Sequence, residues 1–312
     1  MKKISALTLA ALMIFSAGGL MIFSAVALIS CANTKGGLDS IADYVIANYV
    51  VSKDCGEFTY ADAVGETAII TKFSVKSGVT EVDMSAADFK MNDRAISGIG
   101  DQAFYYCTSV TSIKLPSTIK SIGNFAFAGC ESLEEIRIPA SVQSIGKEAF
   151  QGCKSLKRVI FETGELTDDD GNKYTGTACT SIGKAAFADC VALESFGAEG
   201  SVGVVLPASL TTLGEGAFLR CGKLTAVEFN DALLSVGEQA FYKCERVQKV
   251  VFPDNQNLTE KNLGDSIFTP TIKPVLEEAA VNTSNEAIKK YVEKMVYRAP
   301  ETEAETTAES AT

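Results

Sequence analysis

The sequence predicts an α/β repeat solenoid with a short parallel sheet on one face and short helical or 3₁₀ turns on the other. Three observations lead to this prediction. An Ala-Phe pair recurs at intervals built on 23 residues, a cysteine follows each pair three residues later, and alternating apolar residues follow each cysteine. A unit of about 20 to 29 residues buries its apolar face only by stacking on its neighbours.

Six repeat units align on the Ala-Phe pair. The phenylalanines of these pairs are Phe104, Phe127, Phe150, Phe187, Phe218 and Phe241. Their successive spacings are 23, 23, 37, 31 and 23 residues, so inserts of 14 and 8 residues interrupt a regular array. We place these inserts at about residues 162–176 and 196–203.

Each unit is expected to contribute one short strand with one buried face. Ile136 and Ile138 alternate with Arg137, which is the pattern of a half-buried strand. Pro139 follows, and it ends the strand because it has no amide hydrogen for the ladder. Residues 146–153 are expected to form a tight helical or 3₁₀ turn on the opposite wall, with Phe150 filling the space between two turns of the coil.

The cysteines are expected to be buried. Six of the nine occupy one repeat position, namely Cys107, Cys130, Cys153, Cys190, Cys221 and Cys244. A row of this kind between apolar positions predicts a ladder of small core side chains. It gives no pairing preference for disulfides and does not cluster ligands around a metal. Cys179 aligns with Val142 and should also be buried, whereas Cys55 lies outside the array and is the best candidate for a free thiol.

The repeated motif Ile-Gly-x-x-Ala-Phe-x-x-Cys-x-x-Leu-x-x-Ile-x-Ile-Pro resembles the Treponema-type, or BspA-like, leucine-rich repeat of bacterial surface proteins. The repeat domain covers residues 79–270, with an incomplete opening unit at 79–84 and a degraded closing unit at 263–268. The resemblance implies a curved stack of units and a role in adhesion or protein binding. It assigns no catalytic residue, and the inserts depart from its regular array.

Composition excludes several functions. The chain has 39 acidic and 28 basic residues, a net charge of -11 and no histidine. No region is basic enough to bind nucleic acid, and the absence of histidine removes Ser/His/Asp and Cys/His nucleophile systems. The sequence therefore predicts no cofactor, no metal ligand and no catalytic residue.

Neither insert carries a recognisable ligand loop. The run Asp168-Asp169-Asp170-Gly171-Asn172 looks like part of a calcium loop, but that register would place Leu166 and Thr177 at positions that require acidic ligands. A β-hairpin protruding from the solenoid is predicted there instead. The second insert is glycine-rich without the Lys-Ser or Lys-Thr ending of a phosphate loop, so it is predicted to be a flexible loop.

The N-terminus is predicted to carry an export signal. Residues 1–30 begin with Lys2 and Lys3 and continue as an apolar segment. Leu28-Ile29-Ser30-Cys31 resembles a bacterial lipobox, which implies lipidation of Cys31 and attachment of the mature chain to a membrane. Removing two lysines and no acids changes the net charge from -11 to -13. An uncleaved membrane helix and ordinary secretory cleavage remain as alternatives.

The open ends of the solenoid need covers. An N-terminal capping region is placed at residues 31–78, with an amphipathic helix over 38–49 and a β-rich run over 67–75. A C-terminal cap is placed at 271–298, where Thr283-Ser-Asn-Glu286 resembles a capping box ahead of a helix reaching about Tyr297. Residues 299–312 form an acidic tail that is expected to be disordered.

The predicted binding surface is the outward column at the middle of the strands, formed by Lys114, Arg137, Ile160, Val205, Glu228 and Val251. Side chains on parallel strands about 4.8 Å apart form a continuous surface. The function expected is a non-catalytic, monomeric, membrane-anchored recognition or adhesion module whose partner is a host or envelope protein. The alternatives are a periplasmic envelope scaffold and a hydrolase using carboxylates of the first insert, namely Glu162, Glu165 and Asp168 to Asp170.

Overall fold

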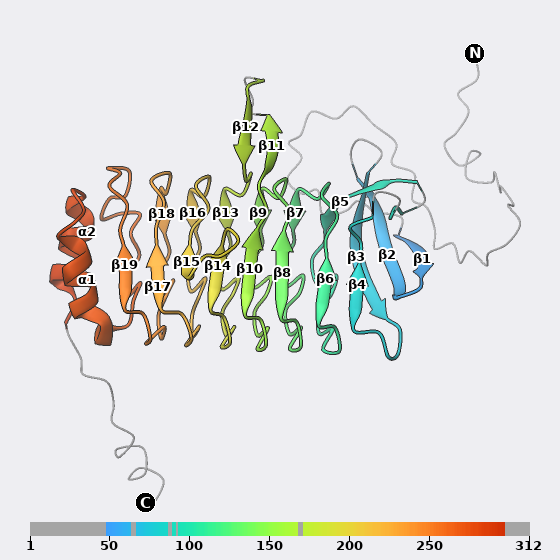
Figure 1. The fold of residues 1–312 in the computed structure, drawn as a ribbon, viewed down its shortest axis with the longest axis horizontal. Coiled ribbons are helices and arrows are strands. Elements are labelled where there is room, and N and C mark those ends of the chain that lie inside the picture. The colour runs from blue at the N-terminus through green and yellow to red at the C-terminus, as the bar shows by residue number, and fades with distance from the viewer. Residues whose placement is uncertain (1–47, 64–66, 87–88, 92, 168–170, 297–312) are drawn as a thin grey trace, which may run out of the picture.

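The computed structural model of the chain describes residues 48–63, 67–86, 89–91, 93–167 and 171–296. These residues wind into an elongated solenoid (Figure 1). The predicted signal segment, Cys31 and the acidic tail lie outside the described residues. Most of the helix predicted over 38–49 does so too, and its last two residues, Asn48 and Tyr49, belong to strand β1.

One wall of the solenoid is the predicted parallel sheet, here called sheet I. Its eight strands run in the order β19-β17-β15-β14-β10-β8-β6-β4. They are β4 (Glu81–Asp83), β6 (Ser112–Lys114), β8 (Glu135–Ile138), β10 (Arg158–Phe161), β14 (Ser195–Gly197), β15 (Gly203–Val205), β17 (Ala226–Glu228) and β19 (Lys249–Val251). All neighbours pair in parallel, which confirms the predicted fold class.

The opposite wall contains a second sheet, here called sheet II, that the repeat pattern did not indicate. Its nine strands are β1 (Asn48–Lys53), β2 (Gly56–Ala63), β3 (Thr67–Val75), β5 (Ala95–Ile99), β7 (Ser121–Ile122), β9 (Ser144–Ile145), β13 (Ser181–Ile182), β16 (Thr212–Leu213) and β18 (Ser235–Val236). Strands β1 to β3 form an antiparallel meander, and β3 then pairs in parallel with β5. The meander closes the first end of the core, where Phe58 and Phe73 contact Phe104.

The turns from sheet II to sheet I are not helical. Each of the six repeat turns holds two residues with positive φ, one before the Ala-Phe pair and one before the cysteine; in the first these are Gln102 and Tyr106. A left-handed residue interrupts a right-handed helix. The turns are therefore separate hydrogen-bonded turns, as where the Cys107 amide donates to the Phe104 carbonyl at 3.2 Å.

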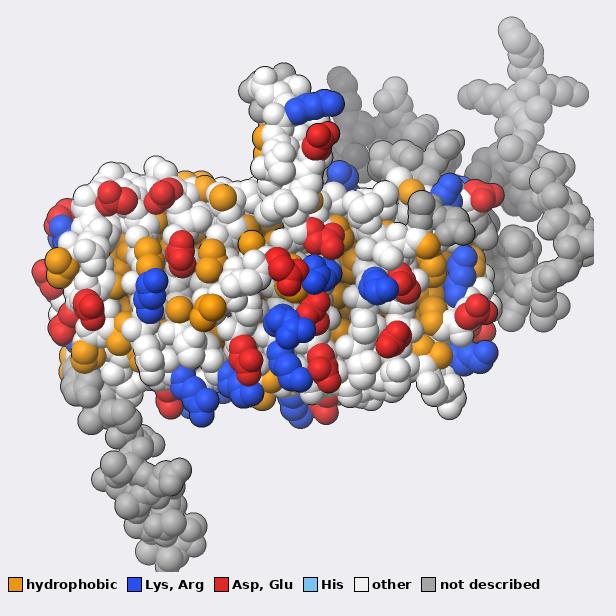
Figure 2. Space-filling view, in the orientation of Figure 1, with side chains coloured by type: hydrophobic (Ala, Val, Ile, Leu, Met, Phe, Trp, Pro, Cys, Tyr) orange, Lys and Arg blue, Asp and Glu red, His pale blue; other side chains and the backbone are white. Residues whose placement is uncertain are grey.

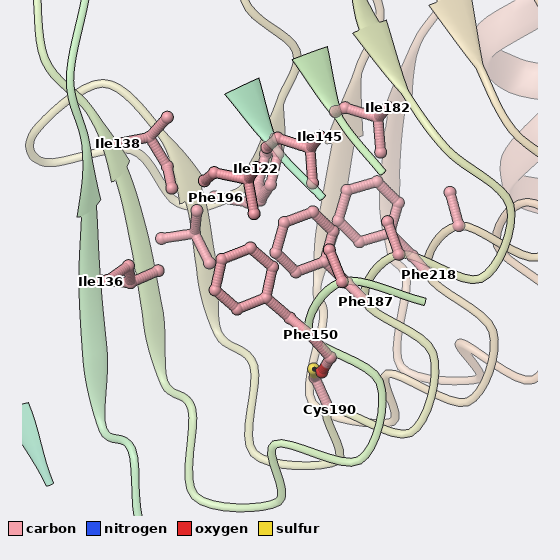
Figure 3. Close-up of a cluster of buried hydrophobic side chains, with 14 of the residues drawn as sticks. Ile122, Ile136, Ile138, Ile145, Phe150, Ile182, Phe187, Cys190, Phe196 and Phe218 are labelled. Carbon is pink, nitrogen blue, oxygen red and sulfur yellow. Dashed lines mark hydrogen bonds between the residues drawn. The ribbon is translucent and has the colours of Figure 1, made fainter. Parts of the chain in front are cut away.

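A stack of phenylalanine rings forms the axis of the core. The six repeat phenylalanines and Phe268 of the closing unit are fully buried, and consecutive ring centroids are 5.0–5.5 Å apart. Figure 3 shows three of these rings, Phe150, Phe187 and Phe218, beside isoleucines from both sheets. The ladder of aromatic side chains predicted from the 23-residue period is therefore confirmed.

The second insert adds a strand rather than a flexible loop. Phe196 in β14 and Val204 in β15 are parallel partners separated by only eight residues, whereas parallel neighbours normally need a crossover of a dozen or more. Gly200 and Gly203, both with positive φ, allow the short return. Phe196 lies edge-on to Phe187 and Phe218, at 5.1 and 4.9 Å, which explains why these two rings have the widest spacing in the stack.

The first insert forms the predicted hairpin. Strands β11 (Gly164–Thr167) and β12 (Lys173–Gly176) pair in an antiparallel sheet of their own and project from the solenoid (Figure 1). Leu166 and Tyr174 face each other across the two strands, and Tyr174 is exposed. The hairpin prediction is confirmed, and Asp168 to Asp170 lie outside the described residues.

Helices close the second end of the core. A 3₁₀ turn, η3 (Pro270–Ile272), leads into α1 (Lys273–Ala280), and α2 (Glu286–Lys294) follows. Asn285 caps α2 by accepting the amide hydrogens of Ala287 and Ile288. The predicted cap was Thr283, but its hydroxyl donates to the Pro253 carbonyl at 2.8 Å instead. The helix ends at Lys294 rather than near Tyr297.

The stack predicts a large cost for removing one ring. Phe150→Ala should lower the free energy of unfolding by about 3–5 kcal/mol. The substitution leaves a cavity between two rungs, the name used here for successive repeat units, and neither rung can move in to fill it independently of its neighbours. Chemical denaturation measures this loss. Tyr174→Ala on the exposed hairpin is the control and should cost about 0.5 kcal/mol or less. Equal losses in the two variants would contradict a core built on the ring stack.

Candidate functional site

The predicted binding column lies on the outer surface of sheet I and is called the strand face; it comprises Lys114, Arg137, Ile160, Val205, Glu228 and Val251. Strand register places Arg137 beside Ile160 and Glu228 between Val205 and Val251. Lys114, Arg137 and Glu228 are exposed, Val251 is 38% exposed, and Val205 is half-buried. The added strand β14 inserts Gly197 into the column beside Ile160.

The expectation that Ile160 is exposed is wrong, because its side chain is only 3% exposed. Ile160 lies in register between Arg137 and Gly197. Glu199, two residues after Gly197, reaches Arg137 with a 2.8 Å ion pair. The loop of the second insert therefore crosses above Ile160 and shields it from solvent.

Ion pairs between neighbouring rungs hold the charged side chains of this surface. Lys114 contacts Asp83 at 2.8 Å, and Arg158 contacts Glu135 at 2.6 Å. Hydrogen bonds from the Lys114 ammonium and from Ser85 lower the pKa of Asp83 to about 2. Exposed pairs of this kind add little stability, because water and salt screen them. Their effect is to fix the pattern of charge, and acidic and basic side chains are mixed on the face shown in Figure 2.

Sequence reasoning missed three acidic residues that pair with the basic side chains of this surface, namely Asp83, Glu135 and Glu199. Asp83 pairs in register with Lys114, so extending the column into the opening unit identifies it. Glu135 precedes its strand-face neighbour Arg137 by two residues on β8. The sequence does not identify Glu199 in this way, because its contact with Arg137 depends on the path of the insert loop.

The repeat cysteines are buried as predicted, and each of five donates its thiol hydrogen to a carbonyl of the preceding rung. The Cys153 Sγ lies 3.2 Å from the Phe127 oxygen, and four other pairs repeat this contact at 3.1–3.2 Å. Burial raises the pKa of the thiols, to about 11 for Cys107 and about 12 for Cys179 and Cys244. The structure shows all eight described cysteines as free thiols, with Cys55 alone only half-buried.

The carboxylates of the alternative hydrolase do not form a site among the described residues. Glu162 and Glu165 are exposed at the base of the hairpin, and Asp168 to Asp170 lie outside the description. No group of three or more acidic or cysteine side chains in the described part of the chain is arranged to hold a metal ion. Within the same residues, no helix is long and apolar enough to cross a membrane.

A rigid parallel sheet with an open, charge-patterned outer surface defines an interaction scaffold of the leucine-rich repeat class. Residues 83–202 and 174–292 match the family described as BspA type leucine-rich repeat region, in six copies. The chain therefore belongs to this family. The family suggests a protein-interaction module and a non-enzymatic scaffold, of the kind found in cell-surface or exported bacterial proteins.

One solved structure shows the same fold, and a second is similar in sequence. A leucine-rich repeat protein of T. pallidum is 24% identical, with a TM-score of 0.55 over 78% of this chain and 95% of that one. A leucine-rich repeat protein from Bacteroides ovatus is 30% identical, with a TM-score of 0.44 over 72% of this chain and 56% of that one. A search of the curated proteins finds no match.

Proposed function

We propose that the chain is a non-catalytic, membrane-anchored recognition or adhesion module of the bacterial cell envelope that binds a protein partner through its strand face. The observation that carries this proposal is the ordered column of exposed side chains on sheet I, held in place by the strand register and by ion pairs. A surface arranged before binding loses little side-chain freedom when a partner docks.

Because Ile160 is buried, the exposed part of the strand face consists of two halves. Lys114 and Arg137 form a charged first half, whereas Val205, Glu228 and Val251 form a more apolar second half. The loop that covers Ile160 separates the two halves and itself exposes Val202, which is 71% exposed. A partner that spans the face therefore meets charge at one end and apolar side chains at the other.

Replacing Lys114, Arg137 and Glu228 together with alanine tests the strand face. The immobilised full-length chain is exposed to host and envelope protein extracts, and captured proteins are quantified by mass spectrometry. For a partner captured by the unmodified chain, we expect the variant to capture at least about tenfold less. This corresponds to a loss of about 1.4 kcal/mol in binding free energy.

A matched control removes two lysines and one glutamate elsewhere, at Lys120, Lys184 and Glu215, all of which are exposed. This variant should capture the partner normally. Equal capture by both variants, or equal loss in both, would contradict the assignment of the strand face.

Membrane anchoring rests on Cys31, which is outside the described residues. Acyl chains contribute roughly 0.8 kcal/mol per buried methylene, so several chains hold a folded domain on a membrane stably. We expect radiolabelled palmitate to be incorporated by the unmodified chain and not by Cys31→Ser. Equal incorporation would contradict the lipoprotein assignment.

Protease treatment of intact cells then separates display from a periplasmic location. Cleavage of the chain on intact cells supports an adhesin at the surface. Protection that is lost when the outer envelope is opened supports the second candidate, an envelope scaffold facing the periplasm.

A further inference from the structure

A groove crosses the turns that lead from sheet II to sheet I, away from the strand-face residues. We call it the turn-face groove; its main lining residues are Tyr106, Gly129, Glu131, Gln151, Gly152 and Asp189. It has a volume of about 500 Å³ and spans the first four rungs. Small-molecule sites in proteins have volumes of roughly 300–1,000 Å³.

The groove exists because two neighbouring rungs have glycine at one repeat position. The residue before the repeat cysteine is Tyr106, Gly129, Gly152, Asp189, Arg220 and Lys243 in the six rungs. All six have positive φ, between 54° and 73°. Since four larger residues adopt this conformation, the backbone does not require glycine there. The two glycines instead omit side chains and leave a trough between Tyr106 and Asp189.

Tyr106 forms a flat wall of this trough. An added Cβ at Gly129 would lie 3.1 Å from three atoms of the Tyr106 ring, so the ring rests on Gly129. The residue is 58% exposed, and the Tyr105 ring meets it edge-on with the ring centroids 4.5 Å apart. Next to the ring, an added Cβ at Gly152 would meet no atom within 4 Å. The structure thus has an exposed aromatic surface beside open space.

The charges around the groove are balanced. Three ion pairs surround it: Glu131 with Lys154 at 2.8 Å, Glu148 with Lys147 at 3.2 Å, and Asp189 with Arg220 at 2.5 Å. A charged ligand would add an unbalanced charge beside these pairs. A hydroxyl group both donates and accepts hydrogen bonds, so it can bond to the remaining carboxylate lone pairs without breaking a pair.

We propose that the turn-face groove binds a neutral sugar unit of an oligosaccharide, stacked on Tyr106. The CH face of a sugar ring packs on the aromatic plane, and the Gln151 amide, together with the paired carboxylates, bonds to hydroxyls at the ring edge. This is a binding activity beyond protein recognition at the strand face. It concerns different residues, so its failure would leave the proposed function of the strand face unaffected.

Fluorine NMR of the full-length chain labelled with 3-fluorotyrosine tests the proposal. The chain has nine tyrosines, and Tyr106→Phe identifies the Tyr106 signal. The probes are neutral trisaccharides of glucose, mannose, galactose and N-acetylglucosamine. At least one should shift the Tyr106 signal saturably, with a dissociation constant in the millimolar range. No shift with any of the four would overturn the proposal.

A variant that fills the trough gives the second measurement. The variant Gly152→Lys puts a lysine at the repeat position that Lys243 occupies in the sixth rung. Lys243 adopts a positive φ there, as Gly152 does, so the variant should fold. It should weaken sugar binding at least about tenfold. The control is Gly222→Lys, because an added Cβ at Gly222 also meets no atom within 4 Å and Gly222 lies outside the groove. Melting temperatures verify that both variants are folded.

A peptide probe distinguishes between ligand classes, and the strand-face variant separates the two proposed sites. The peptide acetyl-Gly-Arg-Gly-amide should leave the Tyr106 signal unchanged. If this peptide saturates the signal and the sugars do not, the groove is a contact for a basic protein segment and the proposal is wrong. The triple strand-face variant should bind the sugar normally. Equal binding by the unmodified chain and Gly152→Lys would also overturn the proposal.

Discussion

The close approach of consecutive rungs at one glycine position is the constraint on which the rest of the structure depends. The glycine that follows each strand of sheet II from β5 onward lies against the backbone of the preceding rung. An added Cβ at Gly183 would lie 2.6 Å from backbone atoms of Gly146 and Lys147. The same crowding occurs at Gly123, Gly146, Gly214, Gly237 and Gly264. Because no side chain fits there, the rungs can stack at the spacing of a parallel sheet.

The distance between successive rungs determines which contacts the side chains at the other repeat positions make. It brings phenylalanine rings to 5.0–5.5 Å from one another and places each repeat thiol against a carbonyl of the rung before it. It also joins exposed charges of successive rungs, as between Lys154 and Glu131. Both candidate surfaces follow from this regularity, because each is a column of residues that share one repeat position.

Much of this arrangement could be predicted from the sequence, because repetition ties residues that are distant in the chain to one position in space. The Phe stack, the buried cysteines and the strand column follow from the period alone. The second sheet could not be predicted, since its strands contain only two residues in most rungs and carry no pattern of alternation. The turn conformation also escaped prediction, because residues as different as Phe125 and Glu148 adopt the same positive φ.

The inserts show where pattern reasoning fails. The hairpin was predictable from the Asp-Gly and Gly-Asn dipeptides in the sequence of the first insert, whereas the eight-residue insert gave no indication that it adds a strand and then covers Ile160. The turn-face groove was equally hidden, because the glycines that create it differ from neighbouring rungs only by the absence of a side chain. Such features depend on how rungs lie beside one another.

The substitution Gly183→Ala tests the central claim most directly, with Gly222→Ala as its matched control. An added methyl at position 183 meets backbone atoms of the neighbouring rung, whereas at position 222 it meets nothing within 4 Å. The account predicts that Gly183→Ala lowers the free energy of unfolding by about 1–3 kcal/mol or more, and that Gly222→Ala changes it by about 0.5 kcal/mol or less. Equal stability of the two variants would contradict the claim that contact between rungs at this position builds the fold.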